Sequence, residues 1–115
     1  MYDIEKESRE VLKILKRWAK KPISESYTRG YTAGLADREP AIEIYGYICE
    51  LSSQRNISPE EKLDLIESFV EKGKNEYLKK PNTMGDGFYG KFHRWVLSFK
   101  KDLEYEIPIQ ALKSK

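Results

Sequence analysis

Apolar residues recur at helical spacing along most of the chain. In residues 3–20 they are seven, four and three positions apart, at Ile4, Val11, Leu15 and Trp18. Spacings of three and four place side chains on one face of an α-helix, so this segment is expected to bury one stripe. Acidic residues near its start and lysines near its end suit the helix dipole. Pro22 is expected to end the helix, since proline disfavours helical geometry in the residue before it.

The next two segments have weaker patterns. Residues 24–36 predict a short helix with an N-terminal serine cap, in which Gly30 and Gly34 would allow close packing by a neighbouring element. Residues 40–55 contain the run AIEIYGYICEL, whose β-branched and aromatic residues favour a strand. The length of this segment, the early Pro40 and its apolar spacing of four and three favour a helix instead, and we expect a helix.

The helix that follows has a clear beginning. Ser58 is a suitable N-cap, Pro59 suits the first helical position, and Glu61 stands three residues after the cap, which completes a capping box. The apolar face of this helix then carries Leu63, Ile66, Val70 and Tyr77. Gly73 lies on the same face, where a neighbouring helix could contact it. The run Lys-Lys-Pro at 79–81 is expected to end the helix.

A last helix is predicted from about residue 88 to residue 105, after a turn-rich loop at 82–87. Its expected core residues are Phe88, Phe92, Trp95, Val96, Phe99 and Leu103. Both tryptophans of the chain, Trp18 and Trp95, lie on apolar stripes, so both are expected to be largely buried. Pro108 is expected to end the ordered chain and to leave a short tail at 108–115.

These elements predict an all-α fold, a single small domain that bundles four to five helices within residues 1–107. The chain has 115 residues, 39% hydrophobic and 12% aromatic, which is enough to form a core and unlike a disordered segment. The single cysteine allows no disulfide within the chain, and the acidic start resembles no signal peptide, so a cytoplasmic location is expected. No segment approaches the length of a membrane span, so no membrane partner is expected.

Charge is distributed unevenly, with basic ends and an acidic middle, although the net charge is only +2. Two rows of cations lie at helical spacing, each opposite an apolar face. The first row is Arg9, Lys13, Lys16 and Lys20, and the second is Lys91, Arg94 and Lys101. Such rows can bind a nucleic acid backbone. They are also what the solvated face of an amphipathic helix carries, and we favour this second interpretation.

The loop before the last helix contains the motif G-x-G-x-x-G. Gly85, Gly87 and Gly90 could direct backbone amides at a phosphate, with Lys91 and Arg94 in reach of it. The motif lacks the buried strand before it and the acidic residue about twenty positions later that mark a dinucleotide site. A turn that enters an aromatic helix explains the glycines equally well. We therefore predict no cofactor.

Few residues support catalysis or metal binding. His93 is the sole histidine, with no acidic or cysteine partner at helical spacing, and Cys49 lies in an apolar segment without a nearby base. One histidine and one cysteine cannot supply the usual zinc ligands. We therefore expect a non-enzymatic protein with no metal.

The function favoured by the sequence is a protein-interaction or adaptor module, which includes self-association. Its expected contacts are exposed aromatic residues, because tyrosine and tryptophan dominate interface energetics. The candidates are Tyr45, Tyr47, Tyr89 and Tyr105. A nucleic acid-binding protein that uses both basic rows is the alternative, and a binder of a phosphate-containing small ligand at 85–90 is the third possibility.

Overall fold

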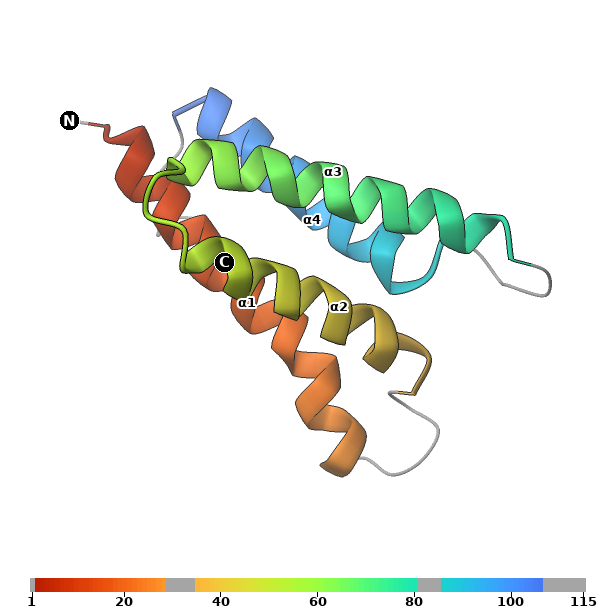
Figure 1. Cartoon of the computed structure of the whole chain (residues 1–115). Coiled ribbons are helices and arrows are strands. Elements are labelled where there is room, and N and C mark those ends of the chain that lie inside the picture. Colours follow the sequence, from red (N-terminus) through yellow and green to blue (C-terminus); the bar gives the residue numbers. More distant parts are fainter. Residues whose placement is uncertain (1, 29–34, 81–85, 107–115) are drawn as a thin grey trace.

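The computed structural model describes residues 2–28, 35–80 and 86–106, and it confirms the predicted all-α domain. These residues form four helices: α1 (Ile4–Thr28), α2 (Leu35–Ser52), α3 (Pro59–Leu78) and α4 (Gly87–Glu104). Figure 1 shows two antiparallel helix pairs, in which α1 packs mainly on α2 and α3 mainly on α4. The two pairs approach each other where α1 and α3 begin and α4 ends (Figure 1).

The core is formed by the apolar stripes of all four helices. Every apolar position predicted to line α4 is buried except Trp95, and the predicted stripe of α3 is buried at Leu63, Ile66 and Val70. From α1 and α2 the core receives Val11, Ile14, Leu15, Ala19, Ala41, Ile44, Ile48 and Leu51. The periodicity of the sequence therefore predicts most of the core correctly.

The first helix extends further than the sequence predicts. Pro22 lies inside α1, which continues to Thr28, so the expectation that this proline ends the helix is wrong. The next residue, Ile23, packs against the core. Tertiary burial thus stabilises a turn that local propensity opposes. The separate short helix predicted at 24–36 does not exist as such, because residues 24–28 belong to α1 and 35–36 to α2.

The second helix resolves the ambiguity between helix and strand at 41–51. This segment is helical, as expected, and the helix begins at Leu35 rather than at Pro40 and ends at Ser52. Pro40 is buried inside the helix. The β-branched and aromatic residues of the segment serve to pack against the other helices, since burial outweighs their lower helix propensity. Gly30, Gly34, Gly85 and the predicted tail at 108–115 lie outside the described residues.

The predicted boundaries of α3 are confirmed in detail. The Ser58 side-chain oxygen accepts a hydrogen bond from the backbone N–H of Glu61 at 3.2 Å, and Pro59 occupies the first turn. Lys79 is the C-cap, two residues before the proline of the Lys-Lys-Pro run.

A close contact joins α3 to α4 at Gly73, as its place on the apolar face of α3 suggests. A Cβ atom on Gly73 would lie 2.4 Å from the ring of Tyr89. The absence of a side chain on α3 thus makes the room for this aromatic ring on α4. Its hydroxyl donates a hydrogen bond to a carboxylate oxygen of Glu43 on α2, so Tyr89 links three helices.

Candidate interaction surface

The two tryptophans meet at the edge where α1 and α4 come together. The ring centroids of Trp18 and Trp95 are 4.7 Å apart with an edge-to-face geometry. The ring centroid of Phe99 lies 5.4 Å from that of Trp18. Both tryptophans pack against the core and are largely buried, as expected, but neither is fully enclosed, so part of each ring stays exposed. We call the Trp18–Trp95 pair, together with Lys91, the tryptophan edge.

Lys91 gives this edge a positive charge. Its ammonium lies 5.5 Å from the centroid of the Trp95 ring, within the range of a cation–π interaction, and the side chain is exposed. Lys91 and Trp95 are four residues apart on α4, so they lie on one face of the helix. Aromatic residues are enriched in protein interfaces, and a charge at the rim of an aromatic patch adds electrostatic selection of the partner.

The sequence contains a signal for this edge that apolar periodicity alone misses. Lys91 precedes Trp95 by four residues and Lys21 follows Trp18 by three, so each tryptophan adjoins a cation on its own helical face. A residue between an apolar stripe and a charged position belongs to the boundary of the stripe, where burial is incomplete.

Members of the two basic rows are partly neutralised within the chain. Arg9 forms an ion pair with Glu5 at 2.7 Å and Lys13 with Glu10 at 3.4 Å, and Arg94 is held by Asp86 at 2.8 Å. Lys20 and Lys101 are exposed, and Lys16 is half-buried. Each row thus contains both exposed cations and cations that are paired with carboxylates of the same chain.

The described glycines of the G-x-G-x-x-G motif have local structural roles. Gly87 has a φ of +61°, a conformation that favours glycine, and a Cβ there would lie 2.9 Å from the Tyr77 ring. A Cβ on Gly90 would lie 1.8 Å from the carboxyl carbon of Asp86. A carboxylate of the chain itself thus lies at the start of α4, where its charge complements the helix dipole and opposes a second anion.

The four candidate tyrosines differ in their surroundings. Tyr105 is 68% exposed, whereas Tyr45 and Tyr47 are half-buried. The Tyr47 ring stacks on Phe69 of α3, with centroids 4.3 Å apart. Tyr89 is buried, so the expectation that it is an exposed contact is wrong. Burial, followed by the hydrogen bond to Glu43, raises the pKa of the Tyr89 hydroxyl well above its ordinary value.

His93 is buried between α3 and α4. Its Nδ1 atom lies 3.3 Å from the ammonium of Lys74, so Nδ1 accepts a hydrogen bond and Nε2 carries the ring proton. Burial, followed by the charge of Lys74, lowers the pKa of His93 from its ordinary value. Cys49 is a half-buried free thiol. Among the described side chains, no group of three or more His, Cys, Asp or Glu residues could hold a metal ion.

Comparisons with known proteins give no relative: no family model, no curated protein and no solved structure matches this chain. None of the helices within 2–28, 35–80 and 86–106 combines the length and the apolar character that crossing a membrane requires.

Proposed function

We propose that this domain is a non-enzymatic interaction module that binds a protein partner through the tryptophan edge. The observation that carries the proposal is the incomplete burial of Trp18 and Trp95, whose rings touch each other at the surface of the bundle. Tryptophan is one of the residue types enriched among interface hot spots. A partner that covers these rings would gain apolar burial at little cost in side-chain entropy, since the two rings already support each other.

A protein partner is favoured over nucleic acid by the state of the basic rows. A phosphate backbone is bound by cations that neutralise several phosphates, so a nucleic acid competes with any carboxylate that already pairs with these cations. Three of the seven candidate cations, Arg9, Lys13 and Arg94, are engaged by carboxylates of the chain. A phosphate-containing small ligand is disfavoured by the Asp86 carboxylate at the start of α4.

The test compares two charge reversals on the same helix. Lys91→Glu changes the tryptophan edge, and Lys101→Glu changes an exposed position that is not part of it. Both variants and the wild type serve as bait for proteins and nucleic acids of the native host, and self-association is measured by sedimentation. We expect partner binding or self-association to weaken by about tenfold or more in Lys91→Glu, because a rim charge of the wrong sign opposes a matched surface. Lys101→Glu should leave binding unchanged.

The same two variants also test the alternative function, nucleic acid binding. A nucleic acid that responds to the summed positive charge would be lost to similar degrees from both variants, with a steep dependence on salt. That result would show that the partner is a nucleic acid and not a protein.

A further inference from the structure

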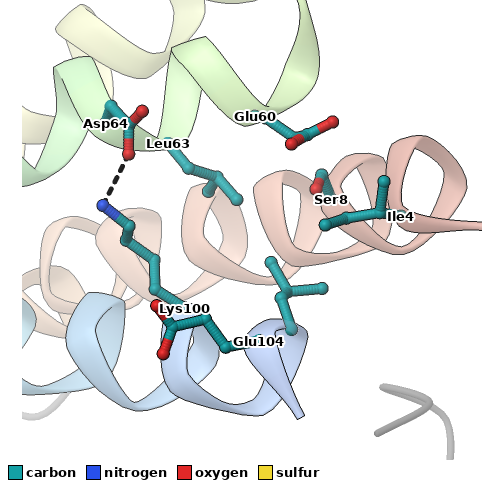
Figure 2. Close-up of a pocket in the computed structure, with 8 residues that line it drawn as sticks. Ile4, Ser8, Glu60, Leu63, Asp64, Lys100 and Glu104 are labelled. Carbon is teal, nitrogen blue, oxygen red and sulfur yellow. Dashed lines mark hydrogen bonds and ion pairs between the residues drawn. The ribbon is translucent and has the colours of Figure 1, made fainter. Parts of the chain in front are cut away.

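A small pocket lies where the two helix pairs approach each other, between the start of α1, the start of α3 and the end of α4. Its volume is about 160 Å³. Ile4, Leu63 and Leu103 form the apolar part of its wall, and polar or charged side chains complete the lining. Figure 2 shows side chains from all three helices around this space. A cavity of about 150 Å³ holds a ligand the size of benzene, so the pocket accepts one ring and not a larger cofactor.

One polar group in the wall has no partner. Ser8 is 0% exposed, and its hydroxyl makes no hydrogen bond in the described part of the chain. In Figure 2 Ser8 lies between Glu60 and Ile4, on the side of α1 that faces the pocket. Buried polar groups are nearly always hydrogen-bonded, so an orphaned hydroxyl in a pocket wall indicates a missing partner. Ile4 is 40% exposed on the first turn of α1 and lies beside Ser8 in Figure 2, so a ligand reaches this hydroxyl by displacing the Ile4 side chain.

The rim of the pocket is acidic. Glu60, Asp64 and Glu104 contribute carboxylates, and Lys100 is the only cation among the lining residues that the structure describes. Lys100 is already bound, to Asp64 at 2.5 Å and to Glu67 (Figure 2 draws the Asp64 bond). This leaves Glu60 and Glu104 without an ion pair in the described part of the chain.

Two further observations support a cation at this place. Glu104 lies in the last turn of α4, where the helix dipole favours a positive charge, so the helix itself gives no reason for a carboxylate there. The nearby Tyr2 hydroxyl, which donates to the Leu103 carbonyl oxygen at 3.2 Å, has a raised pKa, from burial first and then from the charges of Glu7, Glu106 and Glu60. This end of the bundle therefore has a negative potential.

We propose that this pocket binds a small aromatic amine that carries a hydroxyl at the opposite end of its ring. The ring lies between Leu63 and Leu103, the ammonium at the acidic rim next to Glu104, and the hydroxyl reaches the orphaned oxygen of Ser8 at the Glu60 end of the pocket. Each part of the ligand matches one feature of the pocket. The ring fills the apolar volume, the ammonium pairs with the acidic rim, and the hydroxyl bonds to the unpartnered Ser8 hydroxyl. The proposal concerns the pocket end of the bundle and does not rest on the function of the tryptophan edge.

The probe is tyramine, followed by the backbone amide resonances of the full chain in a titration by NMR. A ligand of about ten non-hydrogen atoms is expected to bind with a Kd on the order of 0.1–1 mM. Resonances of residues around the pocket should shift, whereas those around Tyr47 and Phe69 should not. Phenethylamine lacks the hydroxyl and should bind about fivefold more weakly, the value of one neutral hydrogen bond. The anion 3-(4-hydroxyphenyl)propionate should not bind.

Two variants, each with a matched control, assign the contacts. Ser8→Ala should retain phenethylamine binding and abolish the fivefold preference for tyramine, while Ser98→Ala, at an exposed position of α4, should keep it. Ser8→Ala is expected to fold, since the hydroxyl it removes makes no bond in the free protein. Glu104→Gln should weaken both amines, and Glu50→Gln on α2 should weaken neither.

Three results would overturn the proposal. Absence of any shift at the pocket with millimolar tyramine would show that the space is only a packing gap between helix ends. Equal binding of the anionic analogue would show that the rim does not select a cation. A preference for tyramine that persists in Ser8→Ala would show that the hydroxyl of the ligand does not bond to Ser8.

Discussion

The two edges of α4 are built from different chemistry. On the side toward α1, Trp95 meets Trp18 and Phe88 through ring contacts. On the side toward α3, Tyr89, His93 and Lys100 meet glycine, lysine and carboxylates through a close contact and directed polar bonds. We call this second side the polar seam. Ring contacts tolerate changes of angle and distance, whereas hydrogen bonds depend on both.

This difference indicates a division of roles. The polar seam fixes the register of α4 on α3, because Tyr89 fits only where Gly73 leaves room and Lys100 reaches Asp64 and Glu67 together. The tryptophan edge adds apolar burial without fixing a single arrangement, and part of it stays exposed for a partner. Substitutions on the two edges should therefore fail in different ways.

The largest expected effect lies on the tryptophan edge. Trp95→Ala removes a ring that contacts Trp18, Phe88 and Phe92. Because the ring is not fully buried, the free energy of unfolding should fall by about 2–3 kcal/mol, below the usual range for a fully buried tryptophan. Chemical denaturation measures this loss. Leu97→Ala, at an exposed position of the same helix, should change stability by about 0.5 kcal/mol or less. Equal losses in the two variants would contradict the packing role of Trp95.

The polar seam is tested by two glycine substitutions that share helix propensity and differ in space. Gly46→Ala on α2 meets nothing within 4 Å and should gain about 0.5–1 kcal/mol. Gly73→Ala places its Cβ against the ring of Tyr89, whose hydroxyl is hydrogen-bonded to Glu43. Its free energy of unfolding should fall by about 1 kcal/mol net, because the cost of overpacking exceeds the gain in helix propensity. The two variants are compared by their midpoints of denaturation. A stabilised Gly73→Ala would show that Tyr89 moves freely and that the seam does not fix the register.

Much of this fold follows from local patterns in the sequence. The cap at Ser58 and the stripe from Phe88 to Leu103 suffice to place α3 and α4, because capping and periodicity act over a few residues. Pro22 misleads because the penalty of a proline is local, while the burial that offsets it comes from other helices. Pro40 correctly indicates a helix but misplaces its start, since α2 begins at Leu35. The contact between Trp18 and Trp95 depends on how α1 crosses α4, and the pocket at Ser8 depends on how three helix ends meet. Neither is encoded in the spacing along one helix.

The contact between the tryptophans can be measured separately from their burial. A double-mutant cycle of Trp18→Leu and Trp95→Leu keeps apolar volume at both positions and removes the edge-to-face pair. We expect a coupling free energy of about 0.5–1.5 kcal/mol, the usual value for an aromatic pair. A matched cycle of Trp18→Leu with Leu97→Ala should show no coupling. If the tryptophans are also uncoupled, each ring packs on the core independently, and the edge is not a single preformed surface.

The smallest effect concerns the proton on His93 in the polar seam. Burial and the charge of Lys74 lower the pKa of His93 in the folded protein, while Glu71 and Glu67 act in the opposite sense and Arg94 adds to the lowering. The unfolded chain therefore binds a proton on this residue at a higher pH than the folded chain does. The contribution of His93 to stability is present above a pH of about 6.5 and is lost as the pH falls below it.

The free energy of unfolding of the wild type should thus fall relative to that of His93→Gln between about pH 8 and pH 5.5. Denaturation curves of both proteins across this range give the difference between their free energies of unfolding. Carboxylates elsewhere titrate equally in both proteins, so their effect cancels in this difference. Lys74→Met removes one cause of the lowered pKa and should make the dependence on pH shallower. A difference that stays constant with pH, or that grows in favour of the wild type on acidification, would show that the folded protein accepts the proton on His93 as readily as the unfolded chain.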